Sequence, residues 1–375
     1  MIPTDCADPI NRRILCVAED RVTGFHARPF DEIARQSGVD TPLVIERLRA
    51  MLAAGTIRRV RQTLLSTSLA EGALIAWKVP EDKLESAYAW LRDNDPFTGH
   101  VVLRSSENPA APGADYRLWT TLKVPTGYGS MQEHCAILSR IIGAEDCVPL
   151  PVVGMFALAV GHTRRAGLKP GDKLPEPPAM QVPEHPILSP EEWQVLLSLK
   201  ESLNREEICP TPWAGRATAL GMSEQRYCDI AAALDARKVI GRFATFLDHT
   251  APRNRHAGTG AAGLFHWAVP EGMEERAGAE CGRHICMTHC YWRSGGSVFG
   301  GAQIMGVEFR RVLFRSVHAP TREEVLAHKA AIDSHLAACG IPILHTAVFW
   351  SNRAEIRPSE ITPELYRDWL EKYKG

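Results

Sequence analysis

The chain lacks the hydrophobic segments that membrane-spanning and secreted proteins need. Its 375 residues contain no apolar run of about 18 residues or more, so no segment is expected to cross a bilayer. The N-terminal MIPTDCADPI has no basic stretch followed by an apolar run, so we expect no signal peptide and a cytoplasmic protein. In that setting the ten cysteines are expected to be reduced thiols.

An excess of positive charge is also missing. The 43 Lys and Arg residues are balanced by 44 Asp and Glu, giving a formal net charge of −1. Proteins that bind nucleic acid usually carry a clear basic excess, so the overall charge disfavours a DNA-binding role. The phosphate-binding pattern GxxxxGK[ST] is absent, as is a convincing GxGxxG after a strand.

What the chain does contain is an internal repeat. Residues 28–59 (RPFDEIARQSGVDTPLVIERLRAMLAAGTIRR) align without a gap with residues 211–242 (TPWAGRATALGMSEQRYCDIAAALDARKVIGR) at an offset of 183. Each copy has the apolar spacing of a helix, a turn, a second helix and a strand. In the first copy Gly38 supplies the turn and Gly55 ends the second helix. This pattern predicts a winged helix-turn-helix domain in each half.

Two further blocks repeat downstream of each copy. Residues 72–80 align with 262–270, and residues 98–104 align with 287–293. With the helical and strand patterns that follow, each half has the order βαββαβ of a ferredoxin-like domain. We therefore predict an α+β chain built as a tandem repeat of these two domain types. The predicted divisions are winged helices at 1–66 and 191–250, ferredoxin-like domains at 67–167 and 251–375, and a stiff proline-rich linker at 168–190.

Both copies of the third block carry the pattern His-x-x-x-Arg. His100 precedes Arg104, and His289 precedes Arg293. In a strand, residues four apart share a face with their Cα atoms about 13 Å apart, which suits a large ligand. A paired Arg can hold a carboxylate, and a His can transfer a proton near neutral pH or bind a metal. A single strand histidine is more often only structural, and the repeat lowers the weight of that interpretation.

The segment Cys281–Cys290 (CGRHICMTHC) contains several residue types that can bind a metal. It crowds five candidate ligands into ten residues of predicted strand, where alternate side chains face opposite ways, and it contains no CxxC. We therefore predict no protein-bound metal. Other basic residues near the repeated strands are expected to form a cationic cavity for a polyanionic ligand.

Several strings of the chain resemble one known family. RPFDEIARQSGV, VIERLRAMLAAGTIRRV, ALIAWKVPED, GHVVLR and THCYWR are similar to the sirohaem (siroheme) decarboxylases, which are related to Lrp/AsnC regulators. Together these strings cover most of the chain. The segment 295–317 that follows THCYWR departs from the family pattern.

The resemblance implies removal of the acetate carboxyl groups at C12 and C18 of sirohaem. The product would be 12,18-didecarboxysirohaem, in haem or haem d1 biosynthesis. The resemblance also implies that the two halves pair within one chain, with a homodimer possible. No external cofactor is implied, because the iron tetrapyrrole is the substrate.

The resemblance also assigns roles to individual residues. His100 and His289 become candidate proton donors or neighbours of the substrate iron, and Arg104 and Arg293 become candidate carboxylate clamps. The basic residues near the repeated strands add Arg117, Lys123 and His284 as candidate substrate-binding residues, and Tyr291 is a further candidate.

Two other functions fit the same sequence. An Lrp/AsnC-type transcription regulator would place the second helix of the motif in a DNA groove, with Arg47 and Arg49 near phosphate. The second copy carries Glu224, Asp229 and Asp235 on the matching helix, and phosphates would repel them. The other function is a tetrapyrrole carrier that binds sirohaem and releases it unchanged.

Overall fold

The computed structural model describes residues 2–65, 69–111, 113–158, 168–184, 186–247, 260–294 and 312–374. At 157, 158, 288, 289 and 312–316 only the backbone is described. The chain divides into two units, and each contains parts of both sequence halves. The first unit holds the described parts of 1–68 and 186–259, and the second those of 69–158, 168–185 and 260–375.

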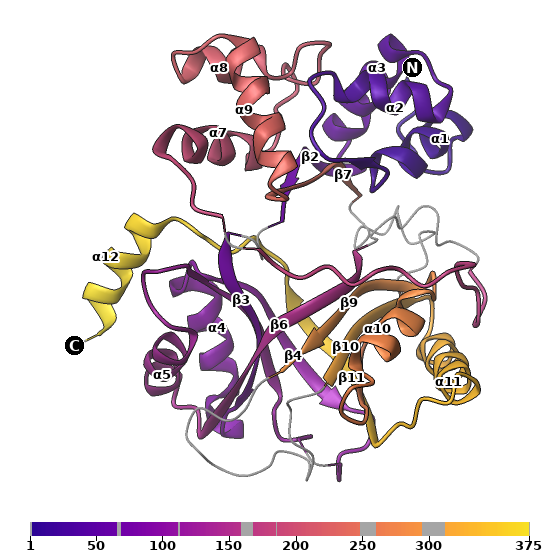
Figure 1. Cartoon of the computed structure of the whole chain (residues 1–375), viewed down its shortest axis with the longest axis vertical. Coiled ribbons are helices and arrows are strands. Elements are labelled where there is room, and N and C mark those ends of the chain that lie inside the picture. The colour runs from indigo at the N-terminus through magenta and orange to yellow at the C-terminus, as the bar shows by residue number, and fades with distance from the viewer. Residues whose placement is uncertain are drawn as a thin grey trace. The chain divides into compact units, whose positions relative to one another are not determined.

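The first unit contains the two sequence copies that align at an offset of 183 residues (Figure 1). The first repeat consists of α1 (Pro9–Ala18), β1 (Val22–Thr23), α2 (Pro29–Ser37), α3 (Thr41–Ala53) and β2 (Ile57–Leu64). The second consists of α7 (Pro190–Lys200), α8 (Ala214–Ala219), α9 (Glu224–Ala236) and β7 (Ile240–Leu247). A three-stranded sheet in the order β1-β7-β2 joins the two repeats, with β2 and β7 antiparallel.

The gapless alignment of the repeats is confirmed by the element boundaries. The helices α3 and α9 and the strands β2 and β7 begin and end at positions displaced by the same 183 residues. The helix α2 starts with a proline in its first turn and ends at Gly38, whose φ of 65° is the left-handed conformation that glycine tolerates. Phe30 of α2 packs edge-on against Phe243 of β7 at 5.4 Å between ring centroids, so the two repeats share one core.

Two helices that open the repeats were not predicted from the apolar spacing. Asp8 caps α1 by accepting hydrogen bonds from the amides of Ile10 and Asn11. Ser189 and Glu192 form a reciprocal capping box at the start of α7. The Ser-Pro-Glu-Glu string at 189–192 is therefore typical of the start of a helix.

The second unit is one closed antiparallel sheet with helices on its outside. The first sequence half supplies β3 (Ala70–Lys78), the short helix η2 (Glu81–Lys83), α4 (Leu84–Asn94), β4 (Thr98–Ser106), β5 (Leu118–Pro125), α5 (Met131–Ile142) and β6 (Asp146–Leu158). The second half supplies β8 (Ala261–Ala268), α10 (Glu274–Gly282), β9 (Met287–Arg293), β10 (Val312–Ala319), α11 (Arg322–Ala338), β11 (His345–Glu355) and α12 (Pro363–Tyr373). The strand order is β10-β8-β11-β4-β5-β3-β6-β9, which closes on β10.

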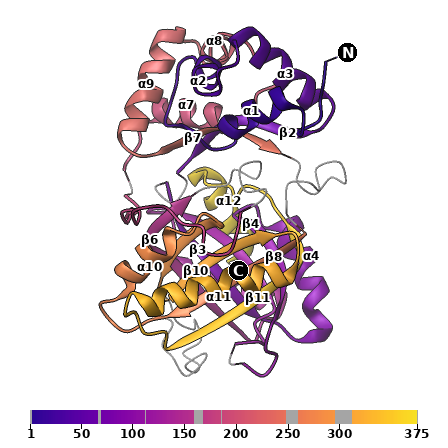
Figure 2. The same ribbon diagram turned by 90° about the vertical axis from the view of Figure 1, so that its right-hand side faces the viewer.

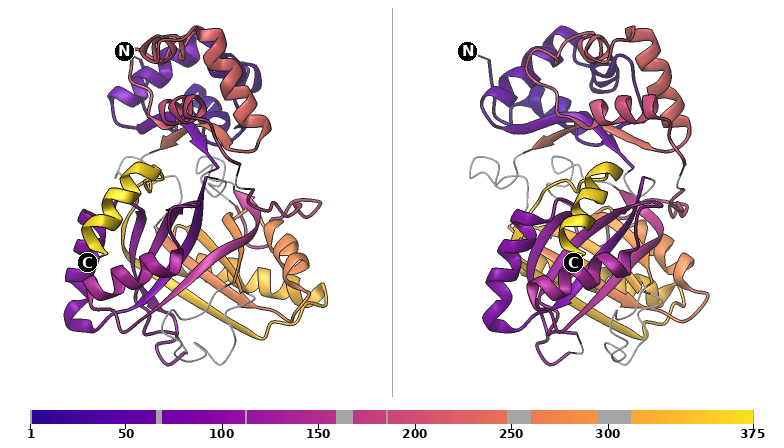
Figure 3. Two further views of the ribbon diagram at one scale, coloured as in Figure 1. Left: turned by 60° about the vertical axis from the view of Figure 1, so that its left-hand side comes forward. Right: turned by 90° about the vertical axis from the view of Figure 1, so that its left-hand side faces the viewer.

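The sheet is closed by two seams between the sequence halves. At one seam β4 pairs with β11, and at the other β6 pairs with β9. Within each half the central strands are the first and third in sequence, β3 with β5 and β8 with β10. Figures 1 and 3 show α4 and α5 beside the strands of the first half and α10 beside those of the second. Figure 2 shows α11 across the outer face of β8 and β10.

Buried hydrophobic residues lie on both faces of this sheet, and the strand sequences are correspondingly apolar. The outer face of each half packs against helices in a separate core, and the core of the first half also includes α12 from the second half. A third cluster is formed by residues that alternate with those outer ones: Leu74, Ala76, Val102, Tyr116, Trp119, Val148, Leu150, Leu264, Ala347 and Phe349. We call the side of the sheet that carries this third cluster the inner face. Strands buried on two sides read as nearly continuous apolar runs, as in Ala73–Trp77.

One predicted element differs from the structure. The sequence predicts strand over the segment Cys281–Cys290, but α10 extends to Gly282 and β9 begins only at Met287. The residues between them form a turn, and His284 makes an isolated bridge with Lys173. Among the described residues, no helix is both long and apolar enough to cross a membrane.

Candidate functional site

The inner face of the closed sheet carries two buried arginines, Arg104 on β4 and Arg293 on β9. Arg104 is two residues from Val102, and Arg293 lies opposite Val152 and near Leu150, so both are in phase with the inner cluster. The strands β4 and β9 are separated by three strands in either direction around the sheet. The two guanidinium groups therefore belong to opposite strands, one from each repeat.

Arg104 is held at the seam between β4 and β11. Its side chain is 8% exposed, and its Nη1 donates a hydrogen bond to Ser351 Oγ at 2.8 Å. Its Nε is buried and has no hydrogen-bond partner among the described residues. Loss of hydration on burial lowers the pKa of this guanidinium to about 10.

Arg293 is held in an analogous way at the other seam. It is 7% exposed, and its Nη1 donates to the backbone carbonyl of Leu150 on β6 at 2.7 Å. The guanidinium carbon lies 4.5 Å from the ring centroid of Tyr291, a cation–π distance. Burial again lowers the pKa of the side chain to about 10. Each arginine thus reaches across a seam to the last strand of the opposite repeat.

Neither arginine is neutralised by a carboxylate of the described chain, and both keep a buried Nε without a partner there. A buried charge without a counter-ion costs several kcal/mol. Buried arginine forks of this kind are suited to binding carboxylate or phosphate with two parallel hydrogen bonds. Each of these two guanidinium groups could therefore bind a carboxylate or a phosphate.

Two histidines also lie on the inner face. His266 on β8 is two residues from Leu264, and His345 on β11 is two residues from Ala347. Their ring centroids are 5.3 Å apart. Burial, with smaller contributions from His345 and Lys329, lowers the pKa of His266 to about 3, so this ring is neutral at physiological pH. Sequence reasoning missed His266, although its alternation with Leu264 was a signal.

The two predicted catalytic histidines, His100 and His289, lie in the strands β4 and β9. His100 lies in β4 beside an irregularity between Thr98 and Val101, where its backbone amide donates to Thr121 Oγ1 at 2.8 Å. The backbone of His289 lies in β9 opposite Leu158 and Ser316. The side chain of His289 is outside the described part of the chain.

The remaining predicted substrate-binding residues are not all brought together. Tyr291 lies under Arg293, as described. Arg117 forms an ion pair with Glu81 outside the regular strand, and Lys123 lies on β5 opposite Gly72. His284 is buried near the end of α10, with its ring centroid 5.2 Å from that of His335 on α11, on the helical side of the sheet.

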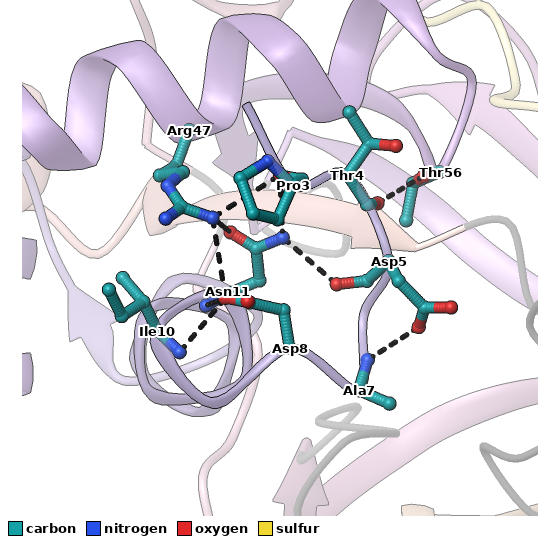
Figure 4. A network of polar contacts seen from close by, with 9 residues as sticks. All are labelled: Pro3, Thr4, Asp5, Ala7, Asp8, Ile10, Asn11, Arg47 and Thr56. Carbon is teal, nitrogen blue, oxygen red and sulfur yellow. Dashed lines mark hydrogen bonds and ion pairs between the residues drawn. The ribbon is translucent and has the colours of Figure 1, made fainter. Parts of the chain in front are cut away.

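In the first unit, the arginines expected to contact DNA serve the fold. Figure 4 shows Arg47 of α3 within a polar network, where its Nη1 contacts Asp8 Oδ1 at 3.3 Å and Asn11 Oδ1 at 3.4 Å. Arg47 is 9% exposed. Arg49 donates to the backbone carbonyl of Arg205, and Glu224 of α9 pairs with Arg28 at 2.5 Å. Arg47 is therefore buried within the fold, and Arg49 and Glu224 are engaged in contacts with other parts of the unit.

Comparisons with known proteins agree on one family. No protein-family model matches the chain. A siroheme decarboxylase of Hydrogenobacter thermophilus is 26% identical over 298 residues, which are 79% of this chain and 80% of that protein. The siroheme decarboxylase alpha subunit of Desulfovibrio desulfuricans is 32% identical over 159 residues, 41% of this chain and 82% of the subunit.

Solved structures show the same fold. The crystal structure of the siroheme decarboxylase NirDL in complex with an iron-uroporphyrin III analogue superimposes with a TM-score of 0.66. The match covers 97% of this chain and 98% of that one at 20% sequence identity. Taken with the 32% identity to most of the Desulfovibrio subunit, these findings show that the chain belongs to the sirohaem decarboxylase family.

Proposed function

We propose that this chain removes the acetate carboxyl groups at C12 and C18 of sirohaem and releases 12,18-didecarboxysirohaem for haem or haem d1 biosynthesis. The observation that carries the proposal is the pair of buried arginines on the inner face, for which the described residues supply no carboxylate partner. Sirohaem carries eight carboxylates, so it is an anion large enough to engage groups on opposite strands. The names of the relatives support the same substrate.

The proposed role of Arg104 and Arg293 is to hold carboxylates that do not react. An ion pair to the departing acetate would stabilise the ground state more than the transition state, in which that charge has moved into the macrocycle. The guanidinium groups are therefore assigned to neighbouring carboxylates, which fixes the ring. The reacting acetate would then lie against the apolar inner cluster, where loss of hydration favours expulsion of CO2.

The reaction needs one proton for each CO2 that leaves. The bond between the methylene and the carboxyl carbon breaks, its electron pair passes into the macrocycle, and an acid then protonates the carbon to give a methyl group. We assign this acid to a histidine of the repeated pattern. The candidates are His100 in the first repeat and His289 in the second. His266 is a poor candidate, because a group with a pKa near 3 carries no proton to donate at neutral pH. The macrocycle itself accepts the electron pair, so the proposal includes no external cofactor and no protein-bound catalytic metal.

We further propose the domain assignment that the sequence suggested. The helices and strands of the first unit would be two winged helices, at 1–66 and 191–250. The order βαββαβ and the central pairs β3–β5 and β8–β10 support ferredoxin-like domains at 67–167 and 251–375, joined through the linker 168–190. The two repeats would correspond to paired subunits of relatives such as the Desulfovibrio protein, and further association into a homodimer stays a prediction.

The proposal is tested by anaerobic incubation of the full chain with sirohaem, followed by mass spectrometry of the tetrapyrrole. The expected product has lost two molecules of CO2. Binding of sirohaem with no change in mass would support the carrier instead. Binding of DNA and not of sirohaem would support the regulator.

A further inference from the structure

A cluster of three potential metal ligands lies away from the inner face, where the last turns of α10 and α11 meet. Glu280 comes from α10, His335 from the last turn of α11, and Cys339 is the residue that caps α11. One potential ligand atom from each of these residues lies within 4.8 Å of the others. His335 and Cys339 are four residues apart, so they share one face of the helix.

The separations between the atoms fit a small tetrahedral ion. His335 Nε2 lies 2.7 Å from Glu280 Oε2 and 3.7 Å from Cys339 Sγ. Zinc binds nitrogen and oxygen at about 2.0–2.2 Å and sulfur at about 2.3 Å, which places neighbouring ligand atoms roughly 3–4 Å apart. A small movement of Glu280 away from His335 would therefore bring the ligand atoms to the separations that a zinc ion requires. The side chains of His335 and Glu280 are 10% and 18% exposed, so an ion can reach them.

A candidate fourth ligand lies beside the three clustered residues. His284, in the turn that follows α10, is buried, and its ring centroid is 5.2 Å from that of His335. The set of one thiolate, two imidazoles and one carboxylate is of the borderline type that zinc prefers over magnesium or calcium.

Two cationic side chains, Arg283 and Lys173, border the cluster and would affect how it binds a metal ion. Arg283 Nη1 lies 3.1 Å from Glu280 Oε2, and Lys173 Nζ lies 3.0 Å from His335 Nδ1. With the lysine donating to Nδ1, the proton of the neutral imidazole is on Nε2, directed at Glu280. A metal at Nε2 would move that proton to Nδ1, where the ammonium of Lys173 would oppose it. Arg283 can continue to donate to the carboxylate as a second partner behind the metal.

We propose that Glu280, His335 and Cys339, with His284 as the fourth ligand, form a zinc site that fastens α10 to α11. The thiol of Cys339 gives its proton to solvent when the ion binds. This site uses no residue of the inner face, and it departs from the sequence-based expectation of no protein metal because its ligands come from separate helices.

Titration of the metal-free full chain with Zn²⁺, in competition with a chromophoric chelator, tests the site. We expect one tight equivalent, and a thiolate-to-metal charge-transfer absorption when Co²⁺ replaces Zn²⁺. Cys339→Ser and His335→Ala should each weaken binding at least about 100-fold, since even the loss of a partner behind a ligand costs about 10–100-fold. The matched control Cys209→Ser removes a half-buried thiol of the first unit and should leave binding unchanged.

A second variant tests the geometry without removing a ligand. Lys173→Gln replaces the opposing ammonium with an oxygen that can accept the proton of Nδ1, so it should tighten Zn²⁺ binding several-fold. Persistence of the Co²⁺ absorption in Cys339→Ser, or wild-type binding no tighter than that of Cys339→Ser, would overturn the proposal. Circular dichroism of each variant separates loss of the site from loss of the fold. The test contains no sirohaem, so its outcome is independent of the proposed reaction.

Discussion

Replacement of Arg104 by methionine should stabilise the substrate-free protein and weaken substrate binding at the same time. The guanidinium is buried, and its pKa of about 10 lies well below the ordinary value of 12.5. A difference of that size corresponds to about 3 kcal/mol by which burial disfavours the charged form at neutral pH. The penalty is fully present below about pH 10 and is relieved only as the pH rises toward 12.5.

The net effect follows from two opposing contributions. Methionine fills a similar volume without a charge, but the hydrogen bond to Ser351 is lost, which costs about 1 kcal/mol. We therefore expect a gain of about 2 kcal/mol, or a rise in Tm of roughly 4–8 °C for a unit of this size. Loss of a charge-assisted contact to a carboxylate should raise the Kd for sirohaem about 10–100-fold.

Thermal unfolding of the free protein and a sirohaem titration followed by absorption measure these two effects. Arg357→Met is the matched control. This guanidinium donates to four backbone carbonyls, including those of Thr98 and Leu91, so its loss should destabilise the unit by about 2–4 kcal/mol. If Arg104→Met lowered the Tm as Arg357→Met does and left sirohaem affinity unchanged, Arg104 would be a structural residue and our reasoning would be wrong.

Three further predictions follow from other sites. Arg293→Met should behave as Arg104→Met does in the same two assays, whereas Tyr291→Leu should lower sirohaem affinity less, because it removes only the ring beneath the guanidinium. The pKa of His266 near 3 means that the unfolded chain binds a proton between about pH 3 and 6.5 that the folded chain does not, so stability falls as the pH drops through this window. Denaturant titrations at pH 7.5 and pH 5 should differ by about 2 kcal/mol more in wild type than in His266→Gln. Arg47→Ala should destabilise the first unit by about 1–3 kcal/mol by breaking the network with Asp8 and Asn11, and gel-shift assays should detect no change in DNA binding.

The repeat made much of the local structure predictable from the sequence. The boundaries of α3, α9, β2 and β7 follow the gapless alignment, because turn and cap residues act locally. The apolar spacing did not reveal α1 or α7, whose helix starts depend on capping residues. It also could not show that His284 lies in a turn beside α11, since that position depends on how α10 ends.

The candidate site was predictable in residue type but not in arrangement. The repeated His-x-x-x-Arg pattern identified Arg104 and Arg293 as candidate ligands for carboxylates. That the two arginines lie on opposite strands of one closed sheet depends on the pairing of β4 with β11 and β6 with β9, and these contacts are distant in sequence. The burial of both charges without a carboxylate partner in the described parts of the chain follows from that closure, so no local pattern could have indicated it.

The measurement that tests the central claim most directly compares the binding of sirohaem with that of its methyl ester, which has the same macrocycle without the carboxylate charges. If the buried arginines bind carboxylates, the wild-type protein should bind sirohaem at least about 100-fold more tightly than the ester. In the double variant Arg104→Met, Arg293→Met, this preference should largely disappear. Equal binding of acid and ester by the wild-type protein would contradict the account, as would a preference that the double variant retains.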